Sequence, residues 1–340
     1  MSTNRTHPHP SGPARPAAPA PSEVSEALAA TDPAAALVAP AETVSTDGPV
    51  DPGVLVRAGE AFGPVPLPAG VDPVTVRTLA GELTALHAAP VGAPRGTVLL
   101  VPGFTGSKED FAPLVPLLAA SGWDTWAYSQ RGQADSVAPE GVDAYRLEDF
   151  AGDVLQVAAV VGAGEPVHLV GHSFGGLVAR AAALARPDAF LDVVLLCSGP
   201  RGWGSGREQM LALLDDQGSL GVWARDFPDH VDTDPAELEP YVAYRRLRAE
   251  RTSTDSLRGI VHVLWDADDR TEDLRATGLR TLVAHGETDT AWPQEWQAQM
   301  AEVLGGGYEI IAGAGHCPAE EQPAATAEVL DRFWGAPRPR

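Results

Sequence analysis

The stretch that most constrains the fold of this chain is V-H-L-V-G-H-S-F-G-G-L, residues 167–177. An apolar run leads to a serine flanked two residues away by glycines, and residues that favour a helix follow. Ser173 is therefore expected at a sharp turn from strand to helix, with its hydroxyl lifted clear of the sheet. Gly171 and Gly175 keep this turn free of side-chain clashes, and Gly176 lets the helix pack close to the strand. The pattern predicts a nucleophile elbow centred on Ser173.

Short apolar runs alternate with helix-like stretches on both sides of this motif. We expect strands at 97–101, 125–128, 167–170, 193–197, 281–284 and 308–312, and a hairpin at 74–79 and 82–87. We expect helices at 111–121, 147–161, 177–186, 295–304 and 324–334. This alternation predicts an α/β fold with a doubly wound, mostly parallel sheet that is covered by helices on both faces.

The alternation stops between residues 199 and 278. This stretch holds helix-like segments at 210–214 and 238–251, and its only strand-like run is 260–264. A structureless loop of this length is implausible inside a compact domain, so we expect a helical cap inserted after the strand that ends near Cys197. The predicted organisation is a disordered Pro- and Ala-rich extension, two parts of an α/β core and the cap between them, with boundaries at 1–52, 53–198, 199–278 and 279–336.

The composition excludes several classes of partner. The chain has a formal net charge of -22 and one lysine, Lys108, so it lacks the clustered positive charge that nucleic acids and anionic membranes require. Its cysteines, Cys197 and Cys317, are expected to be reduced thiols, since they form neither a disulfide framework nor a metal-ligand spacing. It contains no apolar run of about 18 residues and no signal-peptide pattern. We expect a soluble, cytoplasmic protein without a bound metal, and its oligomeric state stays open.

A serine nucleophile needs a base that accepts its proton and an acid that orients the base. His316 follows the expected strand 308–312, and Asp289 follows the expected strand 281–284. Ends of parallel strands meet at one edge of a sheet, so both side chains are predicted to lie near Ser173. Asp289 is the predicted acid, although Glu287 lies close enough in sequence to compete for that role.

The oxyanion that forms when a serine attacks a carbonyl needs two N–H donors. We expect one from the backbone of Phe174, directly after the nucleophile, and the other from Phe104 in the loop P-G-F-T-G-S. Four tryptophans lie in the cap or just after the acid loop, and some of them are expected to line a substrate pocket rather than a packed core. These are Trp203, Trp223, Trp265 and Trp292.

Together, the elbow, the P-G-F loop, the R-G loop at 131–132, the G-E-T-D loop and the final G-H resemble the α/β-hydrolase superfamily over about 74–334. The order Ser, Asp, His along the chain is typical of that superfamily. Relatives usually carry histidine at Pro102 and often aspartate at Ser129, so the loops here depart from the pattern. The serine nucleophile is unlike the aspartate of epoxide hydrolases and haloalkane dehalogenases, and hydroxynitrile lyases need a lysine near the histidine, which this chain lacks.

The resemblance implies a capped serine hydrolase that uses Ser173, His316 and Asp289, without a cofactor. A small-molecule carboxylic ester with an apolar acyl part is the expected substrate. A thioesterase, a lactonase, a C–C bond hydrolase, and a cofactor-free haloperoxidase or perhydrolase would keep the same three residues and stay open. The alternative from another class is a non-catalytic ligand receptor on the same fold.

Overall fold

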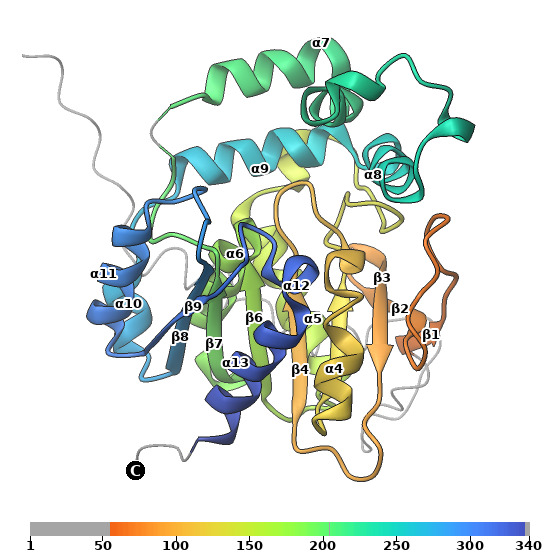
Figure 1. Cartoon of the computed structure of the whole chain (residues 1–340). Coiled ribbons are helices and arrows are strands. Elements are labelled where there is room, and N and C mark those ends of the chain that lie inside the picture. The colour runs from red at the N-terminus through yellow and green to blue at the C-terminus, as the bar shows by residue number, and fades with distance from the viewer. Residues whose placement is uncertain (1–54, 204, 337–340) are drawn as a thin grey trace, which may run out of the picture.

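The computed structural model describes residues 55–203 and 205–336 (Figure 1). The expected extension at 1–52 lies outside these residues. No helix in the described part is both long and apolar enough to cross a membrane.

A nine-stranded sheet forms the centre of the described chain, in the order β1-β2-β3-β5-β4-β6-β7-β8-β9. The strands are β1 Val56–Ala58, β2 Asp72–Thr78, β3 Gly81–Ala88, β4 Thr97–Val101, β5 Asp124–Tyr128, β6 Val167–His172, β7 Phe190–Leu196, β8 Arg280–Gly286 and β9 Gly307–Ile311. β1, β2 and β3 pair in antiparallel fashion, β3 is antiparallel to β5, and all pairs from β5 to β9 are parallel. The predicted mostly parallel sheet is therefore confirmed.

Helices cover both faces of this sheet (Figure 1). The apolar cluster on one face contains residues of α5 Leu147–Val161, α6 Phe174–Ala185 and α11 Gln294–Leu304. The cluster on the other face contains residues of α4 Val115–Ala120 and α13 Pro323–Gly335, and α12 Pro318–Glu321 lies beside α13. β6 lies between the two layers with all six residues buried, as expected for a strand covered on both faces. The doubly wound arrangement follows from this double covering.

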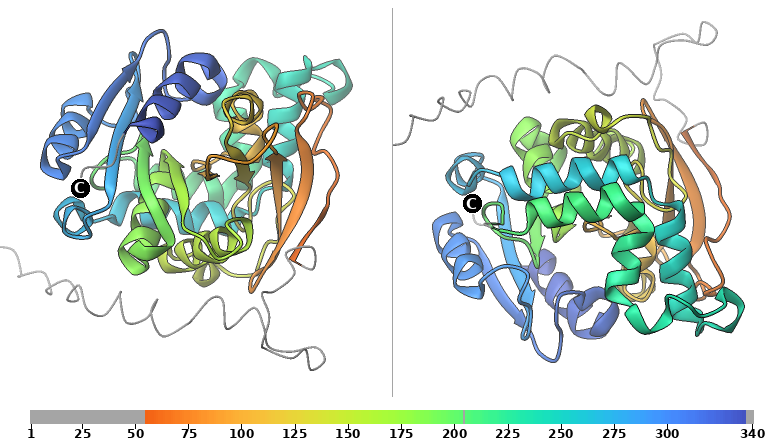
Figure 2. Two further views of the ribbon diagram at one scale, coloured as in Figure 1. Left: turned by 90° about the horizontal axis from the view of Figure 1, so that it is seen from below. Right: turned by 90° about the horizontal axis from the view of Figure 1, so that it is seen from above.

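Four α-helices lie between β7 and β8: α7 Arg207–Asp226, α8 Pro240–Arg251, α9 Thr254–Asp266 and α10 Thr271–Ala276. α7, α8 and α9 lie above the sheet in Figure 1, and the view from above shows α7 and α9 side by side (Figure 2). The carboxyl ends of the parallel strands point toward these helices.

The strand-like run 260–264 belongs to α9 and forms no strand. Its apolar side chains continue a helical spacing that starts before the run, with Leu257, Ile260, Val261 and Leu264 all buried. Leu257 and Val261 pack with Leu214 of α7, so contacts between helices decide the conformation of a segment whose β-branched residues alone favour a strand.

Candidate active site

Ser173 lies at the turn between β6 and α6, with φ 55° and ψ -120°. Its amide donates a hydrogen bond to the carbonyl of Leu196 on β7 at 2.8 Å. The flanking glycines are required by close backbone contacts: a Cβ at Gly171 would lie 2.2 Å from the Gly175 oxygen, and a Cβ at Gly175 would lie 2.3 Å from the Val101 oxygen. Any side chain at either position would clash, which explains the G-x-S-x-G spelling.

The structure brings the serine, the histidine and the aspartate together. His316 Nε2 lies 3.0 Å from Ser173 Oγ, and His316 Nδ1 lies 2.9 Å from Asp289 Oδ1. Asp289 stands in the loop after β8 and His316 in the loop after β9, so adjacent parallel strands deliver both residues to the edge where Ser173 lies. With this geometry, the imidazole can accept the serine proton while the carboxylate holds the ring in one tautomer.

The environment of Asp289 keeps its carboxyl group ionised. Burial alone would raise the pKa of Asp289, but the hydrogen bond and the charge of His316 outweigh it, with help from the Ala291 amide. The net pKa is therefore below its ordinary value. Glu287, the competing carboxylate, is exposed and accepts a hydrogen bond from the Gly313 amide at 3.0 Å.

His172 contacts the main chain and the ring of His316. Its Nε2 donates to the main-chain oxygen of His316 at 2.6 Å, and the two rings are 5.0 Å apart. Burial, followed by the nearby charge of His316, lowers the pKa of His172 to about 4. His172 is therefore neutral near pH 7, and its single ring proton is on Nε2, where it forms the hydrogen bond to the His316 main-chain oxygen.

The two predicted oxyanion donors are the amides of Phe174, directly after Ser173, and of Phe104, in the loop after β4. Phe174 is the first residue of α6, and a first helical amide has no carbonyl partner within its own helix. The amide of Phe104 donates no hydrogen bond within the part of the chain that the structure describes. The loop that carries it touches the nucleophile, since a Cβ at Gly103 would lie 3.1 Å from Ser173 Cβ. Both amides are therefore available as donors, one directly after Ser173 and one in a loop that packs against it.

Three of the four predicted tryptophans form one cluster. The ring centroids of Trp203 and Trp265 are 4.8 Å apart, and those of Trp203 and Trp292 are 5.3 Å apart. Trp292 is fully buried and its Nε1 donates to the Arg201 oxygen at 2.9 Å. Trp223 is not part of this cluster and stacks on another aromatic residue of the insertion.

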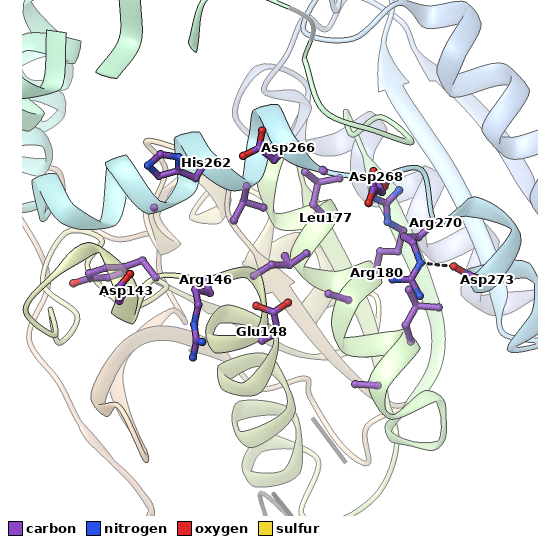
Figure 3. Close-up of a pocket in the computed structure, with 18 of the residues that line it drawn as sticks. Asp143, Arg146, Glu148, Leu177, Arg180, His262, Asp266, Asp268, Arg270 and Asp273 are labelled. Carbon is purple, nitrogen blue, oxygen red and sulfur yellow. Dashed lines mark hydrogen bonds and ion pairs between the residues drawn. The ribbon is translucent and has the colours of Figure 1, made fainter. Parts of the chain in front are cut away.

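A cavity of about 780 Å³ lies between α5, α6, α9 and α10 (Figure 3). Its lining includes Leu177 and Arg180 of α6 and none of the predicted catalytic, oxyanion or tryptophan residues. It is therefore separate from the site at Ser173.

One group of side chains in the described chain could hold a metal ion. Potential ligand atoms of His172, Cys197 and His316 lie within 4.8 Å of one another. Both ring nitrogens of His316 already contact Ser173 and Asp289, so an ion bound there would break the contacts described above.

Gln133 was missed by the sequence analysis. It is fully buried against the loop that carries Phe104. In the sequence, Gln133 is only the second glutamine of the polar loop S-Q-R-G-Q, and this pattern does not predict that its side chain is buried.

Comparisons with known proteins identify relatives along most of the chain. A model described as "Alpha/beta hydrolase family" matches residues 98–329. A protein named "Putative carbamate hydrolase RutD" from Caulobacter segnis is 33% identical over 278 residues, which cover 76% of this chain and 98% of that protein. "Epoxide hydrolase B" from Mycobacterium tuberculosis is 36% identical over 97 residues, covering 28% of this chain and 27% of that protein.

Solved structures with the same fold include an enol-lactonase from Burkholderia xenovorans, with a TM-score of 0.64, 21% identity and coverage of 77% of this chain and 100% of that chain. A thermophilic esterase from Thermogutta terrifontis has a TM-score of 0.63 and 22% identity, with coverage of 77% and 97%. At this identity the likeness concerns the fold, and it agrees with the sheet and helix arrangement described above.

Proposed function

Because the chain belongs to the alpha/beta hydrolase family, whose model matches residues 98–329, we propose that it is a serine hydrolase that cleaves a carboxylic ester. One observation carries the proposal: Ser173, His316 and Asp289 form a continuous chain of contacts at the carboxyl edge of the sheet. A non-catalytic receptor has no need for an acid and a base aligned on an elbow serine.

In the proposed reaction, Ser173 Oγ attacks the ester carbonyl while His316 Nε2 takes the serine proton. Asp289 stabilises the imidazolium, and the amides of Phe104 and Phe174 bind the oxyanion. The tetrahedral intermediate collapses as His316 passes its proton to the alcohol, which leaves an acyl group on Ser173. Water, activated by His316, then releases the carboxylic acid and restores the serine.

We propose that the helical segment 199–278 is a cap that forms the acyl side of the site. Phe104 lies partly buried against an apolar cluster that contains Leu214 and Val222 of α7 and Leu257 and Val261 of α9. An apolar wall beside an oxyanion donor suits an ester with an apolar acyl part. The tryptophans at the base of the insertion are proposed to add to this wall.

A carbamate is the second candidate substrate. The observation that favours it is the Caulobacter segnis relative, a protein named as a putative carbamate hydrolase, of which the alignment covers 98%. A carbamate carbonyl accepts the same attack by Ser173, so the two candidates differ in the leaving group and acyl pocket rather than in the three central residues. Thioesters, lactones and C–C bonds remain further substrates of the same arrangement.

We propose a cytoplasmic location, and the cysteines support it. Cys197 and Cys317 are both free thiols. Thiols of this kind persist in reducing compartments, where disulfides are rare.

The test is intact-mass measurement after exposure to a fluorophosphonate, combined with turnover of p-nitrophenyl esters and matched aryl carbamates. We expect one adduct on the wild-type chain and none on Ser173→Ala. Ser198→Ala is the control, since Ser198 is also buried near the elbow, where its side chain contacts Gly176. This variant should keep the adduct. Labelling that survives in Ser173→Ala, or a wild-type chain that neither labels nor turns over any acyl substrate, would refute the proposed function.

A further inference from the structure

We propose that Gln133 is a positioning residue that aims the Phe104 amide of the oxyanion loop, residues 102–107, at the reacting oxygen. This inference rests on the proposed function, because the orientation of that amide matters for acyl transfer. It concerns a residue on the loop between β5 and α5, about 30 positions away from the loop that it holds.

The Gln133 carboxamide uses both of its ends. Its Nε2 donates to the Gly103 oxygen at 2.7 Å and to the Phe104 oxygen at 3.3 Å, and its Oε1 accepts from the Gln130 amide at 3.0 Å. The side chain has no exposed surface. A buried carboxamide that is satisfied on both sides holds a fixed orientation, since turning it would leave polar groups unpaired.

Gln130 fixes the preceding carbonyl. Its Nε2 donates to the Pro102 oxygen at 2.9 Å, and its side chain is likewise fully buried. Three consecutive carbonyls, at Pro102, Gly103 and Phe104, are therefore held by two neighbouring glutamines. The loop is fixed through its backbone, and the Phe104 side chain remains available to the apolar cluster.

The geometry of a peptide group connects this contact to the oxyanion. The Gly103 carbonyl and the Phe104 N–H belong to the same trans peptide, in which the two groups point in opposite directions. When Gln133 fixes the carbonyl on one side, it fixes the N–H on the other. Gly103 packs against Ser173, so the Phe104 N–H, which points away from Gln133, belongs to a peptide group that adjoins the nucleophile.

The loop that carries Gln133 is itself anchored. The Ala134 amide donates to Thr252 Oγ1 at 3.1 Å, and the buried Lys108 pairs with Asp135 at 2.6 Å. Ala134 adopts φ 48°, a left-handed conformation that a residue other than glycine keeps only when its surroundings enforce it. Gln133 is thus followed directly by two anchored residues, Ala134 and Asp135.

Loss of the contact between Gln133 and the Gly103 carbonyl is expected to weaken binding of the transition state, and so to lower kcat. Removal of one oxyanion donor costs about 10²- to 10³-fold in kcat, and a loosened donor should cost at least about 10-fold. The ground-state carbonyl gains little from the donor, so KM should stay within about 2-fold.

The test compares Gln133→Met and Gln133→Glu with Gln156→Met. Gln156 is the matched control: it is also buried, accepts from the Leu79 amide at 2.7 Å and donates to the Gly152 oxygen at 3.2 Å. These partners lie in the turn between β2 and β3 and in α5, outside the oxyanion loop. We expect both Gln133 variants to lose kcat, to bind phenylboronic acid more weakly in proportion, and to exchange the amide hydrogens of residues 103–107 faster. Gln156→Met should lower Tm about as much as Gln133→Met does, while its kcat and its loop exchange stay at the wild-type values.

The outcomes separate this inference from the proposed function. If Gln133→Met folds and keeps wild-type kcat, boronate affinity and loop exchange, the positioning role is wrong while the serine hydrolase stands. If kcat falls equally in Gln156→Met, the effect reflects general stability and the positioning role is again wrong. If the wild-type chain is inert toward every acyl substrate, the proposed function fails, and loop exchange in the Gln133 variants still decides whether the glutamine holds the loop.

Discussion

At the scale of single residues, the backbone of Ser173 is the most informative feature of the site. Its φ of 55° and ψ of -120° form a combination that residues with a Cβ rarely adopt, at a cost of about 1–3 kcal/mol. The strain is held by the hydrogen bond to Leu196 and by the close packing of Gly171 on Gly175. The fold therefore supports a locally unfavourable conformation in order to present one hydroxyl.

Replacing Ser173 by glycine should relieve this strain. Glycine adopts a positive φ without steric cost, so Ser173→Gly should be about 1 kcal/mol more stable than Ser173→Ala, or about 2–4 °C higher in Tm. Thermal unfolding of the two inactive variants under one buffer condition measures the difference. Equal Tm values would show that the elbow is not strained.

Replacing Asp289 by asparagine should lower kcat by about 10⁴-fold, because the amide favours the wrong tautomer of His316. KM should change little, since the carboxylate lies behind the imidazole. Steady-state kinetics on a p-nitrophenyl ester measure both constants. Glu287→Gln is the matched control and should retain kcat within about 2-fold; an active Asp289→Asn together with an inactive Glu287→Gln would reverse the assignment of the acid.

At the scale of elements, the sequence predicted those features that depend on residues close together in the chain. The Ser173 elbow was found because glycines, an apolar strand and a helix all occur within one short segment. Asp289 and His316 were predicted to lie near Ser173 because ends of parallel strands share an edge, and the structure brings the three side chains together. The run 260–264 resembles a buried strand in composition but is helical, because contacts with another helix outweigh its β-branched residues. Gln133 was missed because its partners are main-chain carbonyls, which leave no trace in the sequence.

The packing of α8 on the core adds a pH-sensitive contact. Glu320 of α12 lies 3.4 Å from Tyr241 Oη and 3.9 Å from Arg245 of α8. Burial, followed by the charge of Asp110, raises the pKa of Glu320 to about 7, even though Arg245 and Arg248 act in the opposite direction. The carboxyl group is therefore protonated in the folded protein at pH values where it is ionised in the unfolded chain.

The sign of the effect follows from linkage. Between the unfolded pKa near 4.5 and the folded value of about 7, the native state binds the additional proton, so stability falls as pH rises through this window and levels off above it. Glu320→Gln should thus match the wild type at pH 4.5 and exceed it at pH 8, by on the order of 2 kcal/mol. Urea unfolding at both pH values measures this, and a difference that does not grow with pH would contradict it.

At the scale of the whole molecule, charge dominates. A net charge of -22 on 340 residues produces self-repulsion in the compact state. Screening this repulsion should raise Tm by a few degrees as NaCl increases from about 0.01 M to about 0.5 M at pH 8. Equal concentrations of sucrose provide a control for general solute effects. A Tm that falls with salt would show that attractive ion pairs, such as Lys108 with Asp135, outweigh the repulsion.

The inserted helices are joined to the sheet through a narrow base. The Gly202 amide donates to the Ala267 oxygen at 2.8 Å, and the Trp203 amide donates to the Leu264 oxygen at 3.0 Å, so the outgoing and returning chains are hydrogen-bonded to each other. Arg180 of α6 donates to the carbonyl of Pro200, which precedes α7, and to that of Asp268, which follows α9. A segment whose ends meet in this way can be lengthened, shortened or exchanged between relatives while β7 and β8 remain paired. Under the proposed function, such changes would alter what enters the site and leave Ser173, Asp289 and His316 in place.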